Sequence, residues 1–161
     1  MERRKTSFKD LQAAVADARS LLEKDYTTVG KWDLAQICGH CCYAINSSFD
    51  GFDSSPPFFI KLIAKIAGMK KKIYSTRTLK VGLPAPSSSI PAPANGDRDA
   101  ETRAVEDFAE AVERIVSYAG SLQPHPVFGP ISNDEWLEFH TIHAMHHLSF
   151  LAPADTAGAA A

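Results

Sequence analysis

Residues 132–150 read SNDEWLEFHTIHAMHHLSF, and this stretch carries four of the six histidines of the 161-residue chain. Ser132 followed three residues later by Glu135 is a capping box, which predicts that a helix begins here. Helical spacing of the apolar residues then continues to about Phe150, and Pro153 cannot extend the helix. The sequence therefore predicts a histidine-rich helix near the end of the chain.

The histidines of this helix share its expected inward face. On a helical wheel, with about 100° per residue, roughly a third of the circumference holds Trp136, Phe139, His140, His143, His146, His147 and Phe150. His143 and His147 are four residues apart, so their imidazoles lie one turn apart on one face, as two ligands of one metal ion do. Burying several imidazoles without partners is costly, and a metal ion removes that cost by binding their neutral forms. His146 should point towards a neighbouring helix.

A third ligand must come from another part of the chain. His40 is the best candidate, because it flanks the apolar stripe of a second helical segment, whereas His125 lies in a Pro-rich turn. Three neutral nitrogen ligands leave a coordination position open, which is typical of a catalytic rather than a structural site. An all-imidazole set suits Zn²⁺ or Ni²⁺. Candidates for the surroundings of the ligands are Gln36, one turn before His40, together with His140 and Trp136.

Helical periodicity covers most of the remaining chain and predicts an all-α protein, with no competing strand pattern. The expected helices run from residue 8 to about 24, from 33 to about 49, from 58 to 69, and from 99 or 102 to about 120. Ser7 and Asp33 are the expected N-caps of the first two. Gly39 lies inside the second helix at a cost of about 1 kcal/mol relative to alanine. We therefore expect Gly39 to permit the close approach of another segment beside His40.

Two segments between the helices have unusual compositions. Residues 82–95 contain four prolines and three consecutive serines, which excludes a helix or a central strand. We expect this long loop to wrap around the helices near the mouth of the metal site. Residues 61–80 contain seven Lys or Arg and no acid, which is either a solvated basic face or an attraction for an anionic substrate.

The composition indicates one soluble domain. Hydrophobic residues make up 45% and charged residues 22%, as in ordinary globular proteins. The net charge of −2 gives no reason to expect nucleic acid. No apolar run is long enough to span a membrane, and the N-terminus does not resemble a secretory signal, so the expected location is the cytoplasm. We expect residues 1–151 to form the domain and residues 152–161 a disordered tail.

All three cysteines lie together, as Cys38, Cys41 and Cys42. An odd, clustered set is not a disulfide framework. The Cys38–Cys41 pair forms a C-x-x-C motif, so a redox or zinc role stands beside simple packing of small residues in a helix. Cys42 can point elsewhere and be reactive.

Two motifs together resemble a known superfamily. The segment Trp32-Asp-Leu-Ala-Gln-Ile-Cys-Gly-His40, followed far downstream by His143-Ala-Met-His146-His147, resembles the DinB-like, or YfiT-like, superfamily of candidate metalloenzymes. The resemblance spans nearly the whole chain. It implies a four-helix bundle with an up-down-down-up arrangement, here with an extra short helix and the long Pro-rich loop, and commonly a homodimer. It also implies a metal triad of His40, His143 and His147.

A smaller group of residues resembles one branch of that superfamily. His125-Pro-Val-Phe-Gly, with Trp136 and His140, is similar to a branch known only as a domain of unknown function. Many members follow the last ligand with Arg-Gly-Gln, but Leu148-Ser149-Phe150 stands here. The role that those polar residues have in other members therefore cannot be assigned to this chain.

The resemblance also suggests a reaction. Members of known activity are S-transferases or isomerases that use small cellular thiols, which implies an enzyme whose metal activates water or a low-molecular-weight thiol for S-transfer or hydrolysis. Its partner would be a small molecule, with no nucleic acid or membrane. One alternative is a non-enzymatic metal-binding or stress-response protein, which a fourth ligand such as His140 or Cys41 would favour. Another is a helical protein that acts through its basic surface without metal.

Overall fold

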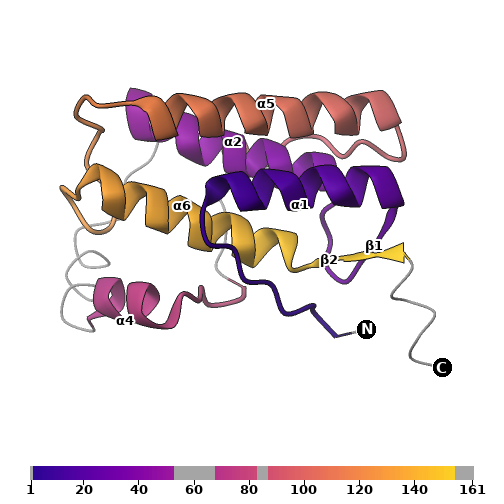
Figure 1. Cartoon of the computed structure of the whole chain (residues 1–161), viewed down its shortest axis with the longest axis horizontal. Coiled ribbons are helices and arrows are strands. Elements are labelled where there is room, and N and C mark those ends of the chain that lie inside the picture. Colours follow the sequence, from indigo (N-terminus) through magenta and orange to yellow (C-terminus); the bar gives the residue numbers. More distant parts are fainter. Residues whose placement is uncertain (1, 53–67, 83–86, 155–161) are drawn as a thin grey trace.

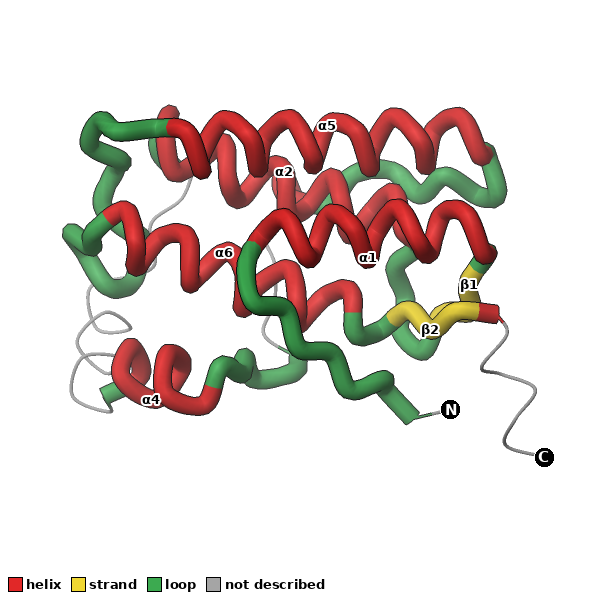
Figure 2. Tube along the Cα trace, viewed as in Figure 1, coloured by secondary structure: helices red, strands yellow, loops and turns green. Residues whose placement is uncertain are grey.

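The computed structural model describes residues 2–52, 68–82 and 87–154, and these are mainly helical (Figures 1 and 2). The four long helices of the described part are α1 (Leu11–Lys24), α2 (Leu34–Asp50), α5 (Arg98–Ser117) and α6 (Asn133–Leu148). The short α4 (Met69–Thr76) and the 3₁₀ turn η1 (Ser87–Ser89) lie between α2 and α5. The predicted all-α class is confirmed. No helix among the described residues has the length and apolar character to cross a membrane.

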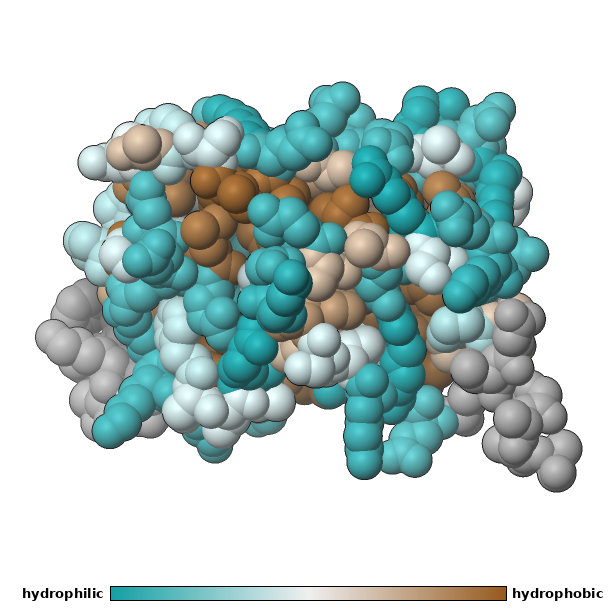
Figure 3. Space-filling model, viewed as in Figure 1, coloured by the Kyte–Doolittle hydropathy of each residue, from teal (hydrophilic) through white to brown (hydrophobic). Residues whose placement is uncertain are grey.

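The four long helices share one hydrophobic core. Helix α2 packs against α5 and α6, and α1 packs against the same two helices. Each helix contributes fully buried side chains, among them Leu11, Leu21, Leu34, Ile37, Phe108, Val112 and Leu148. Burying one such side chain contributes about 1.5–3 kcal/mol. Figure 3 shows hydrophilic side chains over most of one face, with hydrophobic side chains visible between α1 and α5.

The predicted core faces are correct to within one position. In α1, helical spacing predicts a core stripe that includes Leu22, but Leu21 is the fully buried residue and Leu22 is only partly buried. In α2, the spacing predicts a stripe that includes Ala44, but Ile45 is buried in its place. Helical periodicity defines a face about 100° wide, and the exact centre of that face depends on where the neighbouring helices pack.

The predicted Asp33 cap of α2 and the predicted capping box of α6 are confirmed, and the α2 cap is a capping box as well. The Asp33 carboxylate accepts a hydrogen bond from the Gln36 backbone N–H at 2.8 Å, and the Gln36 side chain accepts from the Asp33 N–H. Ser132 and Glu135 form the same reciprocal pair at the start of α6. These motifs are local in sequence, which is why they are visible without the structure.

The starts of the other two long helices were predicted wrongly. Asp10, and not Ser7, caps α1, through a hydrogen bond from the Ala13 N–H to its carboxylate at 2.8 Å. Asp97, before the expected Asp99 or Thr102, caps α5 and accepts from two backbone N–H groups. In both cases an aspartate close to the expected cap takes its place. Its carboxylate accepts the backbone hydrogen bonds and also interacts favourably with the helix dipole. Helix α5 ends at Ser117 and α6 at Leu148, two or three residues earlier than expected.

Two short strands correct the prediction of a strand-free chain. β1 (Tyr26–Thr28) follows α1 and pairs antiparallel with β2 (Leu151–Pro153), which follows α6. The expected tail began at residue 152, but Ala152 and Pro153 belong to β2, and residues 155–161 lie outside the described part. Three-residue strands are too short to show an alternating pattern, and their pairing depends on the tertiary structure. In Figure 1, β2 continues from the end of α6 towards the end of α1, where β1 lies.

Ion pairs neutralise two of the positive charges in the described part of the basic segment, residues 61–80. The helix expected over residues 58–69 lies almost entirely outside the described residues, and α4 begins at its last residue. Lys70 pairs with Glu135 at 2.5 Å, and Arg77 pairs with Glu138 at 2.7 Å. These ion pairs join α4 and the chain after it to α6.

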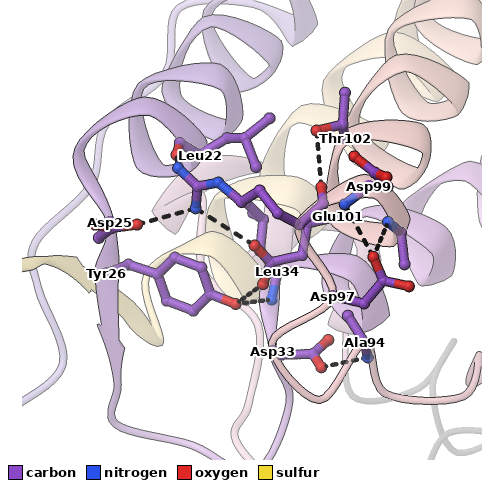
Figure 4. A network of polar contacts seen from close by, with 12 residues as sticks. Leu22, Asp25, Tyr26, Asp33, Leu34, Ala94, Asp97, Asp99, Glu101 and Thr102 are labelled. Atoms are coloured by element: carbon purple, nitrogen blue, oxygen red, sulfur yellow. Dashed lines mark hydrogen bonds and ion pairs between the residues drawn. The ribbon is translucent and has the colours of Figure 1, made fainter.

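A polar junction fixes the N-terminal ends of α2 and α5 against β1 (Figure 4). The carboxylate of Glu101, a residue only 5% exposed, accepts a hydrogen bond from the Tyr26 hydroxyl. The same hydroxyl oxygen accepts from the Leu34 N–H at 2.9 Å. Burial, and then the hydrogen bond to Glu101, raise the pKa of Tyr26, so this phenol stays protonated and can donate. Arg98 completes the junction by pairing with Asp25 at 3.0 Å.

Candidate metal centre

Helices α2 and α6 bring together three histidines that are far apart in the sequence. His40 lies on α2, and His143 and His147 lie one turn apart on α6. One ring nitrogen from each can be chosen so that all three lie within 4.8 Å of one another, a geometry that could hold a metal ion. The His143 Nε2 is 3.2 Å from the His40 Nε2 and 3.1 Å from the His147 Nε2. Two nitrogen ligands of a tetrahedral zinc ion lie about 3.3 Å apart, so the spacing fits.

The tautomer of His40 directs a lone pair into this group. Its Nδ1 lies 2.9 Å from the Ser89 carbonyl oxygen, which can only accept, so Nδ1 carries the proton and Nε2 carries the lone pair. The His143 Nε2 lies between the Nε2 atoms of His40 and His147. It can hold only one proton, so it can donate a hydrogen bond to only one of these two nitrogens. The His40 lone pair therefore points into this group, and a bound cation would satisfy it together with the two nitrogens that face it.

Protonation of the rings is a poor alternative to metal binding. Burial, and then the neighbouring imidazoles, hold the pKa of His143 well below its usual value. The same causes lower the pKa of His147 to about 2, and burial lowers the pKa of His40. All three rings are consequently neutral at pH 7, which is the form that binds a metal.

Aromatic rings hold the three imidazoles in place. The Trp32 indole stacks on the His147 ring, with centroids 5.2 Å apart and planes 12° apart, and also contacts the His40 ring. Phe139 stacks on His143 at 6.1 Å. Trp32 belongs to the motif that carried the family resemblance, but the sequence alone assigned it no contact. The structure places it against two of the three histidines.

The Ser89 carbonyl is held by the loop that follows it. The Gln36 side chain donates to the Pro91 carbonyl at 3.2 Å. The Ala94 N–H donates to the Asp33 carboxylate at 2.7 Å, a contact that Figure 4 shows. Both contacts tie the loop to the first turn of α2, one turn before His40. Gln36, predicted to surround the site, therefore supports His40 indirectly, through the loop. Ser89 was not predicted, because a backbone carbonyl leaves no signal in a sequence.

Gly39 has the role expected of it. A Cβ atom built on Gly39 would lie 2.5 Å from the Pro91 Cγ, closer than two carbon atoms can pack. The missing side chain lets the Pro-rich loop lie directly on α2 beside His40. The described part of that loop thus lies at the site.

Asp33 offers a way to separate helix capping from support of the loop. Asp33→Ala removes both the α2 cap and the Ala94 contact, and should lower the free energy of unfolding by about 1–2 kcal/mol. Asp33→Asn keeps a capping oxygen but has only one, so Ala94 loses its acceptor. We expect urea unfolding to show a smaller loss for Asp33→Asn, with weaker metal binding in both variants. Unchanged metal affinity in both would contradict a role for the loop in orienting His40.

His140 and Trp136 form a second buried cluster beside the three histidines. The His140 ring stacks on Trp136 at 5.0 Å, and its Nε2 lies 2.7 Å from the Ser48 hydroxyl oxygen. Trp136 donates from Nε1 to the Gln123 carbonyl at 3.2 Å. His140 is therefore engaged with α2 at a point away from the metal-capable group. Both residues pack next to Phe139, which stacks on His143.

The remaining candidates lie outside the metal-capable group. The His125 Nδ1 accepts from the Val127 and Phe128 N–H groups at 3.1 Å each, which stabilises the Pro-rich turn. Cys38 and Cys41 are buried in the core, and burial raises the pKa of both thiols. A thiol of this kind is a weak nucleophile, so the structure favours packing for both. Burial also raises the pKa of Cys42, contrary to the expectation of reactivity.

The fold and the site together define an all-α protein with a three-histidine group that could hold a metal ion. The sequence of residues 1–154 matches the family described as protein of unknown function (DUF1569), and the chain belongs to that family. No curated protein and no solved structure matches the chain.

Proposed function

We propose that this protein is a divalent-metal enzyme built on a DinB-like four-helix bundle of up-down-down-up topology. His40, His143 and His147 hold the ion, and Zn²⁺ or Ni²⁺ fits the all-imidazole set best. The close approach of the His143 Nε2 to the Nε2 atoms of His40 and His147, at 3.2 Å and 3.1 Å, carries the proposal. When bound, the ion would supply a Lewis acid with a free position for water or a small thiol.

The surroundings of the histidines support an open rather than a closed site. His140, the expected fourth ligand of a storage site, is engaged with Ser48, and Cys41 is buried in the core. Neither belongs to the metal-capable group found among the described residues. The chain therefore supplies three ligands and orients them through Ser89 and Trp32, leaving a position for a reactant. This favours S-transfer or hydrolysis of a small electrophilic substrate over metal storage.

Cobalt substitution tests the open position directly. We expect Co²⁺-loaded protein to show the visible spectrum of a low-coordinate ion. Addition of a small thiol should then produce the intense near-ultraviolet absorption that a thiolate gives when it coordinates cobalt. A thiol-transfer and hydrolysis screen with the Zn²⁺ and Ni²⁺ forms would follow.

Two results would count against the proposal. A cobalt spectrum that no thiol or other small ligand changes would indicate a closed site and favour the non-enzymatic alternative. Activity that persists at full rate in a His40→Ala variant would place the reaction elsewhere. A His125→Ala variant, changed at a buried histidine outside the group, is the matched control and should keep the cobalt spectrum.

A further inference from the structure

A cavity of about 360 Å³ lies beside the histidine group, on another face of α6. Three separate segments line it: residues 2–6 of the N-terminal segment, residues 77–79 after α4, and four side chains of α6 and its end. The N-terminal segment is held across α6 by a hydrogen bond from the Arg4 N–H to the Ser149 carbonyl and one from the Thr6 hydroxyl to the Met145 carbonyl (Figure 1). The cavity is therefore built by tertiary contacts and is not a gap beside a loose terminus.

Polar groups without partners gather around this cavity. Four buried side-chain nitrogen or oxygen atoms of the described residues have no hydrogen-bond partner, and three of them belong to residues that line the cavity. These three are the Arg3 Nη1, the Arg4 Nε and the His146 Nδ1. Leaving a buried donor or acceptor unpaired is unfavourable, and such groups are often explained by a missing ion or ligand. Two of the three are guanidinium nitrogens, which can only donate.

The charge of the lining matches the unpaired donors. Four basic residues, Arg3, Arg4, Lys5 and Arg77, face one acid, Glu2. Arg4 is paired with Asp17 and Arg77 with Glu138. Arg3 and Lys5 have no ion-pair partner in the part of the chain that the structure describes. The residues around the cavity therefore carry positive charge that no acid of the described part neutralises. They also carry hydrogen-bond donors for which the described part of the protein provides no acceptor.

We propose that this cavity binds a small oxyanion, the carboxylate or phosphate group of a small molecule, chiefly through Arg3, with the free Nε donor of Arg4 beside it and Lys5 at its rim. Guanidinium groups bind carboxylate and phosphate with paired charged hydrogen bonds. The Arg3 guanidinium is already positioned, because it lies over the Phe150 ring at 4.9 Å from the centroid. The site does not depend on a metal ion and stands apart from the proposed reaction.

His146 places this cavity next to the three-histidine group. His146 lines the cavity, and its ring centroid lies 5.0 Å from that of His147, one of the three candidate ligands. The cavity and the three-histidine group thus share one wall of α6. An anionic ligand in the cavity would lie next to the site where the reaction is proposed.

Calorimetric titration of the metal-free protein with inorganic phosphate, and separately with acetate, tests the oxyanion site at constant ionic strength. We expect saturable binding of one equivalent, and the stronger of the two anions identifies the group recognised. Arg3→Gln should weaken binding about tenfold or more, the loss typical of a charged hydrogen bond. Arg19→Gln is the matched control: it removes the same charge from α1, where Arg19 pairs with Glu106 at 2.7 Å away from the cavity.

A measurement on the wild-type protein tests the same site without any substitution, so its result does not depend on whether a variant folds. The ¹⁵N chemical shifts of the Arg3 and Arg4 side chains should move on saturation with the anion, while that of Arg19 stays constant. The absence of saturable binding for both anions would overturn the proposal. Equal weakening by Arg3→Gln and Arg19→Gln would also overturn it, because binding would then reflect net charge alone.

Discussion

Replacing His143 and His147 together by alanine should abolish stoichiometric binding of Zn²⁺. Loss of a residue that merely orients a metal ligand typically lowers affinity about 10–100-fold, so losing two of three ligands should exceed the upper end of that range. The one proposed ligand that remains, His40, cannot hold an ion by itself. Metal content measured by plasma mass spectrometry on protein purified without a chelating tag checks this expectation, with near one equivalent expected in the wild type.

The control for this experiment is a histidine outside the group. His125→Ala removes a buried imidazole that stabilises a turn, and it should leave one equivalent of metal in place. Circular dichroism of both variants shows whether the helices remain. If the double variant and the control retain metal equally, the ligand set is wrong. If neither wild type nor variant takes up Zn²⁺ or Ni²⁺, the histidines act in packing.

The metal-free protein should lose several kcal/mol of stability between pH 7 and pH 5. Burial lowers the pKa of both His125 and His140 to about 3, whereas an unfolded chain titrates near 6.5. The unfolded state therefore takes up protons first as the pH falls. The stability of the folded state is fully present above about pH 6.5 and declines from there towards pH 3. At pH 5 each of the two histidines costs about 2 kcal/mol relative to pH 7.

Urea unfolding at the two pH values measures this loss. His140→Phe keeps a ring against Trp136 but has no titratable nitrogen. The loss of stability between pH 7 and pH 5 should therefore be about 2 kcal/mol smaller in this variant than in the wild type. A wild-type free energy of unfolding that is the same at both pH values would show that the two rings can protonate in the folded state. The comparison depends on the difference between pH values, so a constant effect of the substitution cancels.

Features that depend on neighbouring residues were predicted well. The Asp33 cap of α2, the capping box of α6, the end of α1 at Lys24 and the pairing of His143 with His147 on one helix face follow from contacts three or four residues apart. Helix starts were less accurate, because Asp10 and Asp97 compete with other possible caps nearby. The strands were missed because each has only three residues, and neither would form without its partner.

The sequence alone determined that the protein is helical, that one helix presents two imidazoles on one face, and that Gly39 must make room for another segment. Each of these follows from local geometry, which the order of residues specifies directly. Only the tertiary structure decided that the Ser89 carbonyl sets the tautomer of His40, that Trp32 stacks on His147, and that the unpaired donors of Arg3 and Arg4 surround one cavity. These contacts join segments tens to more than a hundred residues apart, and they exist because the packing of the four helices brings those segments together.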